Sequence, residues 1–268
     1  SFSFIPIVGD YLATGLKYLI QFLNYTVAFI DKLPYSLSEN IRFSIADTWL
    51  TYLFITCIIA LIAYRKFRFI LLGSSFIIAL LISCFWVSYN DLDQRKLVIY
   101  NIPQFSAINF IDGNDNILIS DIKLTKNRSK LLFHIQNNWI NNGVDKEKVV
   151  RLDHLLKKYQ LSNIYRIDNK NLFTKLNYFQ FYDTKIAIID NQFKLNNIVK
   201  KLSVDLLILT KNTKLSIRDM LNLFNPKKII IDASNSIYTS KRLKEEAKTL
   251  NINCWSVLID GAFQIELK

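Results

Sequence analysis

Glycine, histidine and cysteine are scarce in this chain, and their scarcity excludes several kinds of site. The six glycines are nowhere spaced as Gly-x-Gly-x-x-Gly and none precedes a Lys-Ser or Lys-Thr pair, so no nucleotide-binding loop is predicted. The only histidines, His134 and His154, are expected on helices as ordinary side chains rather than as metal ligands or general bases. Cys254 is the one cysteine outside the apolar segments, so neither a disulfide nor a Cys-x-x-Cys zinc site is predicted there. We therefore expect no cofactor.

Charged residues are absent from two consecutive apolar segments. Trp49–Tyr64 contains 16 residues and Phe69–Tyr89 contains 21. A helix of the second length covers roughly 30 Å, which is the thickness of bilayer hydrocarbon. We predict transmembrane helices at about 46–64 and 69–89, the first of which places Asp47 at the level of the lipid headgroups. The alternative is a buried hairpin inside a large soluble protein.

The connection between these segments predicts their orientation. Arg65-Lys66-Phe67-Arg68 carries three positive charges, whereas Asn90-Asp91-Leu92-Asp93 follows the second segment. By the positive-inside rule the connection is cytoplasmic, which makes the chain after Tyr89 extracytoplasmic and the protein a multi-pass component of the cytoplasmic (inner) membrane. Helices outside this sequence could impose the opposite orientation. Met220 is the only methionine, so we expect the C-terminal piece of a longer protein.

The positive charge of the chain is confined to its second part. The first 94 residues hold six basic and six acidic side chains, so the net charge of +12 belongs to the remainder. A basic domain favours polyanionic partners such as nucleic acid or anionic lipid headgroups, although a biased genome and a solvated surface would give the same composition. We divide the chain into a membrane segment, 1–94, with an amphipathic helix at about 11–33, and a soluble domain, 95–268.

The soluble domain begins with short runs rich in Val and Ile. Strands are predicted at Leu97–Asn101, Ala107–Ile111 and Ile117–Ile122, the last two joined by an Asp-Gly turn. Helices are predicted at Lys126–Asn142 and from about Asp145 onward. Further strands are expected from 162 to 167 and from 179 to 190.

Toward the C-terminus, strands and helices alternate. Apolar runs at 206–210, 229–231 and 255–259 are separated by helical patterns at 216–224 and 240–250. This order indicates a βαβαβ unit with parallel strands. The predicted fold class is thus an α-helical membrane segment followed by an α/β domain, with a mixed sheet and flanking helices.

Two groups of charged side chains are candidates for binding. The basic group could contact nucleic-acid phosphates or be an ordinary solvated helix face, and it comprises Lys227, Lys228, Lys241, Arg242, Lys244 and Lys248. Asp112, Asp115 and Asp121 could bind a cation, although aspartate is also a common turn residue. An enzyme with an unrecognised site would need polar groups from Asp112, Asp121, Asp232 or Asp260 to converge in one pocket.

Three stretches together resemble the C-terminal domain of the ComEC family, the bacterial DNA-uptake channel of natural competence. They are Val204-Asp205-Leu206-Leu207-Ile208-Leu209-Thr210, Asn225-Pro226-Lys227-Lys228-Ile229-Ile230-Ile231, and 249–263 with its closing Asp260-Gly261-Ala262-Phe263. Residues 22–36 are similar to the end of the family's membrane competence region. The resemblance implies a membrane protein for DNA uptake in transformation, with a metallo-β-lactamase-like soluble domain.

The chain departs from the family at the positions that hold metal ions for phosphodiester cleavage. The opening Asp-x-Gly-x-Gly-Asp is replaced by residues 101–106, and the His-His pair by Lys211-Asn212, which makes Asn101, Gln104, Lys211 and Asn212 the degenerate-site positions. A protonated lysine cannot ligate a metal. We therefore predict that the fold persists while the metal site and any nuclease activity are lost.

The expected partners follow from this resemblance. They are DNA, bound non-specifically, the membrane, and other competence-machinery proteins or a second copy of the chain. Lys211 is expected to supply positive charge for DNA where the metal was. The rival hypothesis is a membrane-anchored α/β module that docks a protein and has no nucleic-acid role. Basic residues gathered on one face would favour the DNA-uptake hypothesis. An even spread of basic residues together with an apolar patch would favour the protein-docking module.

Overall fold

The chain divides into two units, Ser1–Phe43 and Ser44–Lys268. The computed structural model describes residues 6–31, 42–144, 146–152, 171–175, 177–193 and 201–267. In the first unit, the helix predicted at about 11–33 is α1 (Pro6–Asp31). It begins at Pro6, whose fixed φ suits the first turn of a helix. Large apolar side chains such as Phe22 and Tyr25 are exposed on α1.

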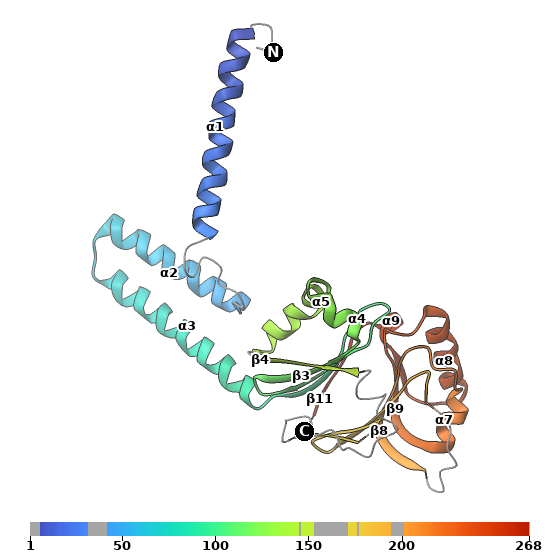
Figure 1. Cartoon of the computed structure of the whole chain (residues 1–268). Coiled ribbons are helices and arrows are strands. Elements are labelled where there is room, and N and C mark those ends of the chain that lie inside the picture. Colours follow the sequence, from blue (N-terminus) through green and yellow to red (C-terminus); the bar gives the residue numbers. More distant parts are fainter. Residues whose placement is uncertain are drawn as a thin grey trace. The chain divides into compact units, whose positions relative to one another are not determined.

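Helices occupy both apolar segments at the start of the second unit. They are α2 (Ile45–Tyr64) and α3 (Arg68–Leu92), which lie side by side (Figure 1). Both are long and apolar enough to cross a membrane. In the most apolar 18-residue stretch of each helix, only 11% (α2) and 6% (α3) of the stretch is buried. The hairpin is therefore not the buried core of the described domain, which counts against the soluble-hairpin alternative.

A polar contact ties the two helices together. Ser44 and Asp47 form a capping box at the start of α2. The hydroxyl of Ser83 on α3 donates to Asp47 Oδ1 at 2.7 Å, so the one acid in α2 is neither free nor solvated. At the other end, Arg65 adopts a left-handed conformation and terminates α2.

The rest of the unit is an α/β domain with two sheets. The first has the order β11-β1-β2-β3-β4, comprising Phe263–Glu266, Arg95–Ile99, Ala107–Asp112, Asp115–Ser120 and Lys146–Arg151. The second has the order β10-β9-β8-β7-β6-β5, comprising Cys254–Ser256, Phe224–Ile231, Leu202–Leu209, Thr184–Ile189, Tyr178–Phe181 and Leu172–Lys175. Both are mixed, because each contains parallel and antiparallel pairs.

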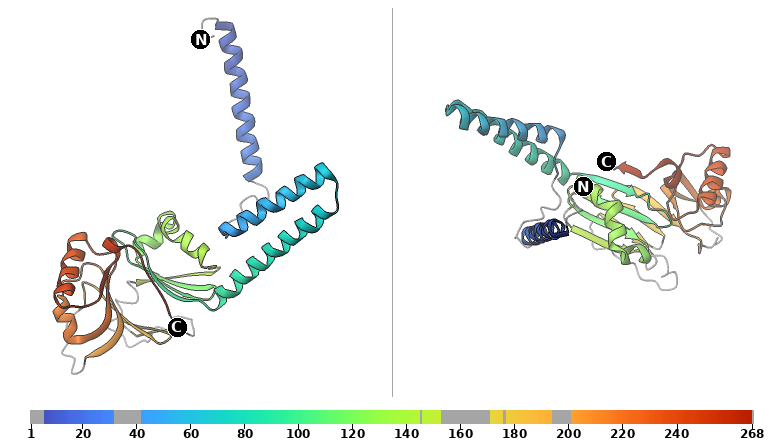
Figure 2. Two further views of the ribbon diagram at one scale, coloured as in Figure 1. Left: turned by 180° about the vertical axis from the view of Figure 1, so that it is seen from behind. Right: turned by 90° about the horizontal axis from the view of Figure 1, so that it is seen from above.

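Helices cover the outer face of each sheet, so the domain has four layers. On the first sheet lie α4 (Ile122–Lys126) and α5 (Arg128–Asn141); on the second lie α7 (Ile217–Leu223) and α8 (Ile237–Thr249) (Figures 1 and 2). A further short helix, α9 (Val257–Asp260), follows β10.

Three apolar clusters match these layers. The cluster between the sheets contains Phe110, whose ring lies 5.3 Å from that of Phe181 and 6.3 Å from that of Phe179. A second cluster joins the second sheet to α7 and α8, and a third joins the first sheet to α4 and α5, with Trp139 at its rim. Period-two alternation along the strands supplies the inner and outer faces of both sheets.

The predicted βαβαβ unit is confirmed, because β8, β9 and β10 are parallel and are joined through α7 and α8. The predicted hairpin between β2 and β3 is also confirmed. Gly113 in its turn has φ +59°, and a Cβ there would lie 2.9 Å from the carbonyl oxygen of Leu92, so only glycine fits.

Two predicted elements are wrong. Residues 146–151 form strand β4 instead of the start of a helix, because Val149 and Val150 pair in parallel with Leu118 and Ile119 of β3. The strand expected at 255–259 ends at Ser256, and the chain turns through α9. His154 and the run at 162–167 lie outside the described residues.

Candidate functional site

The positions singled out by sequence resemblance meet at one cavity. It has a volume of about 420 Å³ and is lined by Gln104, Phe105, Asp121, Ile122, Lys123, Lys211, Asn212 and Ser234. These residues come from the chain that follows β1, β3, β8 and β9, so both sheets contribute. The predicted positions Gln104, Lys211 and Asn212 are thereby brought together, whereas Asn101 is not among the lining residues.

Backbone geometry at the cavity is unusual and is fixed by hydrogen bonds. Gln104, Lys211 and Asn212 all have positive φ, at 73°, 54° and 55°. The amide of Gln104 donates to the carbonyl of Ala233 at 2.9 Å, and that of Asn212 to Asn235 Oδ1 at 3.0 Å. These bonds hold non-glycine residues in a conformation that costs about 1–2 kcal/mol each.

Lys211 and Asp121 form an ion pair in this cavity. Lys211 Nζ lies 3.0 Å from Asp121 Oδ1, and the two side chains are 23% and 13% exposed. The other carboxylate oxygen of Asp121 accepts from the amide of Ser106 at 2.7 Å. The pair therefore bridges the ends of β3 in one sheet and β8 in the other.

A buried acid lies next to this pair. The amide of Lys211 donates to Ser234 Oγ at 2.7 Å, and that hydroxyl donates to Asp232 Oδ1 at 2.5 Å. Asp232 is fully buried, and none of the described residues donates a hydrogen bond to its Oδ2. Burial, with a smaller contribution from the charge of Asp121, raises the pKa of Asp232 to about 7 against the lowering effect of the Ser106 and Ser234 hydroxyls. Asp232 consequently changes charge near neutral pH.

The residues at the cavity do not fit the metal ions that the family resemblance implies. Asp121 is the only carboxylate among the described lining residues, and an ammonium group is already bound to it. An ammonium has no lone pair and repels a cation. Across the described part of the chain, no group of three or more His, Cys, Asp or Glu side chains is placed to hold a metal.

Of the four aspartates of the unrecognised-enzyme hypothesis, two lie close together and two are engaged elsewhere. Asp121 and Asp232 are neighbours, as their charge coupling shows. Asp112, however, accepts from the hydroxyl of Tyr182 and from the amide of Asn171, and Asp260 pairs with a lysine of α8.

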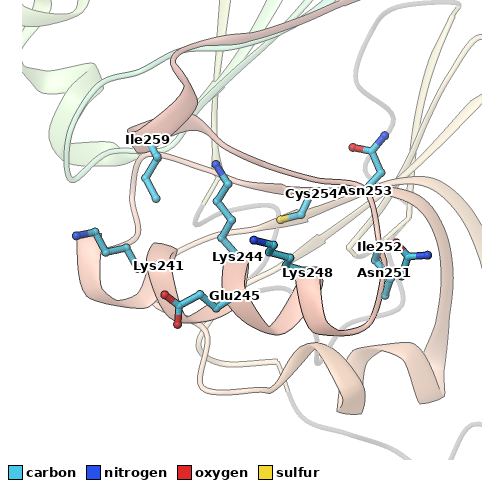
Figure 3. A pocket seen from close by; sticks show the side chains of 9 residues that line it. All are labelled: Lys241, Lys244, Glu245, Lys248, Asn251, Ile252, Asn253, Cys254 and Ile259. Atoms are coloured by element: carbon cyan, nitrogen blue, oxygen red, sulfur yellow. The ribbon is translucent and has the colours of Figure 1, made fainter.

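The second recess is a groove of about 640 Å³ along α8. It is lined by Lys241, Lys244, Glu245, Lys248, Asn251, Ile252, Asn253, Cys254 and Ile259 (Figure 3). Lys241, Lys244 and Lys248 recur at i, i+3 and i+7 and therefore share one helix face. Lys244 Nζ lies 2.5 Å from Asp260 Oδ1. We call this the α8 groove.

The other predicted basic contacts are engaged elsewhere. Lys227 pairs with Asp205 at 2.7 Å. The ammonium of Lys228 lies over the rings of Trp255 and Phe263, at 5.4 and 4.7 Å from their centroids. Arg242 is one position round the helix from the groove and pairs with Glu246 at 2.7 Å. Of the seven basic residues predicted as possible contacts, Lys241, Lys244 and Lys248 line the α8 groove and Lys211 lines the cavity.

Sequence reasoning missed Ser106, Ser234 and Asn235 as parts of the cavity network. The signal was present, because Asp232-Ala233-Ser234-Asn235 follows a buried strand and such residues bond to their own backbone in turns. His134 lies half-buried on α5, as predicted, with its ring edge-on to that of Phe133.

Comparison with known proteins gives one match. A family model described as ComEC C-terminal domain matches residues 97–267, which is well over half of the chain. No curated protein and no solved structure matches the chain. The metallo-β-lactamase-like character of the domain stays a prediction of the sequence resemblance.

Proposed function

The chain belongs to the ComEC C-terminal domain family, and from this premise we propose that it takes part in the uptake of DNA across the cytoplasmic membrane during natural transformation. In this proposal, α2 and α3 cross the membrane, with the Arg65–Arg68 turn on the cytoplasmic side. The basic domain then faces outward, where incoming DNA arrives. Other competence proteins or a second copy of the chain are the proposed protein partners.

We further propose that the soluble domain binds DNA without cutting it. The observation that carries this is the ion pair that Lys211, at a degenerate-site position, forms with Asp121. Metal-dependent hydrolysis of a phosphodiester needs ligands that hold the ion and activate water. Here the single lining carboxylate holds a tethered ammonium instead, so the charge of a metal is replaced but its coordination chemistry is not.

The net charge of +12 supports DNA as the ligand, because it resides in the domain that lies beyond the apolar helices. Contacts of lysine and arginine with phosphates are independent of base sequence, and their affinity falls steeply with salt. This is the behaviour that a receiver of arbitrary DNA needs.

The proposed function is tested by the transformation frequency of the source organism with this gene intact, deleted, or truncated after Tyr89. Loss of transformation in both altered strains is the expected result. If transformation is lost on deletion but not on truncation, the protein has the uptake role and its soluble domain is not needed for it. An unchanged frequency on deletion, in a strain shown to be competent, would overturn the proposal in favour of a membrane-anchored protein-interaction module.

A further inference from the structure

The α8 groove has the charge arrangement of a site for a linear polyanion. Lys241 and Lys248 at its two ends are exposed, and neither has an ion-pair partner among the described residues. Lys244 between them is only 35% exposed and is held by Asp260. The groove thus offers two available ammonium groups on either side of a third that is fixed in place.

The spacing of the two outer lysines suits a nucleic-acid strand. Seven residues of α-helix rise about 10 Å. Phosphates of one strand of duplex DNA advance about 3.4 Å along the axis per nucleotide, so Lys241 and Lys248 are about three phosphate steps apart. Long, flexible lysine side chains adjust readily to small differences in this spacing.

The lining also indicates which part of a nucleic acid is recognised. Beside the lysines lie Asn251 and Asn253, whose amides can bond to phosphate or sugar oxygens. Ile252 and Ile259 are apolar, and no described residue that lines the groove has an aromatic ring on which a base could stack. The chemistry therefore favours contact with the backbone over reading of the bases.

We propose that the α8 groove binds the phosphate backbone of a DNA strand, with Lys241 and Lys248 on phosphates and Lys244 positioned between them by Asp260. This assignment rests on the proposed function and locates its DNA contact away from the cavity of Lys211. A straight row of charges on one helix suits a polymer with regularly spaced phosphates better than a set of separate lipid headgroups.

The test is DNA binding by the full chain in nanodiscs of zwitterionic lipid, measured as fluorescence anisotropy of a labelled duplex of about 30 base pairs. The variant is Lys241→Gln together with Lys248→Gln. Its matched control is Lys126→Gln together with Lys175→Gln, which removes the same charge from exposed positions on α4 and β5. All four lysines are exposed, so equal thermal midpoints are expected.

The groove variant is expected to bind more weakly and to lower the slope of log affinity against log salt by about 1.8, which corresponds to two phosphate contacts on duplex DNA. The control is expected to keep the wild-type slope. Equal losses in both variants would overturn the groove while leaving DNA binding intact. Absence of wild-type binding would contradict the proposed function itself and the groove with it. A groove variant that keeps the wild-type affinity for DNA but no longer binds vesicles of anionic lipid would overturn the assignment, because the groove would then be a lipid site.

Discussion

The cavity and the α8 groove both contain lysine, yet they use its charge differently. In the cavity the ammonium of Lys211 is three-quarters buried and bound to Asp121, so its charge serves contacts within the fold. In the groove Lys241 and Lys248 are exposed and unpaired within the described residues. A lysine that compensates a buried acid is not available to a ligand, whereas one on a helix face is. The comparison separates a lysine that is paired inside the fold from exposed lysines on a surface suited to binding.

The largest predicted effect concerns Asp232 beneath the cavity. Its pKa is raised from 3.8 to about 7 in the folded state, so the folded chain binds a proton that the unfolded chain has released. The contribution of Asp232 to stability is therefore greatest below about pH 4 and falls until about pH 7, by about 4 kcal/mol in total. We expect Asp232→Asn to remove this fall, as measured by urea unfolding between about pH 5 and pH 8.

Exposed Asp183 provides the control, because Asp183→Asn should keep the wild-type pH dependence. Parallel pH profiles for Asp232→Asn and the wild type would show that Asp232 is already ionised in the folded protein and would contradict this account of the cavity.

The second-largest effect is expected from a substitution that breaks the ion pair between Lys211 and Asp121 in the cavity. Lys211→Met leaves the Asp121 carboxylate largely buried beside Asp232 and without its cation. Removing one partner of a buried pair costs several kcal/mol, and partial exposure reduces this to about 2 kcal/mol here. Adding Asp121→Asn should restore part of the loss, because the uncompensated charge is then gone. Additive losses in the double variant, measured by urea unfolding, would show that the two groups do not interact.

The third effect sharpens the comparison, because Lys244 lies in the groove but is paired. Lys244→Gln is expected to lower stability by less than about 1 kcal/mol, since both partners are partly exposed. Hydrogen bonding from Lys244 lowers the pKa of Asp260 despite the opposing effect of burial, so the pair contributes above the usual carboxyl pKa and is lost in acid. The measurement is the thermal midpoint of the variant and of the wild type at neutral and at acid pH. A loss of stability that is the same at both pH values would show that it does not come from the ion pair.

The smallest effect is at Cys254 in the groove. Burial raises the pKa of this thiol to about 11, so little thiolate is present at neutral pH. In a Cys57→Ser, Cys84→Ser background, alkylation of Cys254 by iodoacetamide should be slow and should accelerate up to about pH 11. Bound DNA should slow it further. A fast reaction at neutral pH would show that the thiol is not buried as described.

Local patterns predicted most of the domain. Alternating apolar runs fixed the parallel unit of β8, β9 and β10, and the Asp-Gly turn fixed the hairpin of β2 and β3. Strand β4 could not be found in this way. Its pairing with β3 joins residues about 30 positions apart in the chain, and a helical reading of 145–159 considers only near neighbours.

The α8 groove and the cavity also differ in how far local sequence patterns predict them. The period of α8 predicts that Lys241, Lys244 and Lys248 share a face, and it also places Arg242 about 100° or more away from each of them. The pairing of Lys211 with Asp121 was not predicted, because the two residues are 90 positions apart and Asp121 alone looks like a turn aspartate. The order of the motifs shared with the family pointed to Lys211, which lines the cavity. Only the packing of the two sheets shows that this lysine pairs with Asp121.

The most direct test of this account is a lysine footprint, in which the full chain is acetylated with and without DNA and each site is followed by mass spectrometry. DNA should slow acetylation of Lys241 and Lys248 and leave the rate at Lys211 unchanged. Protection of Lys211 with no protection in the α8 groove would contradict the account, because the DNA would then be bound at the degenerate site.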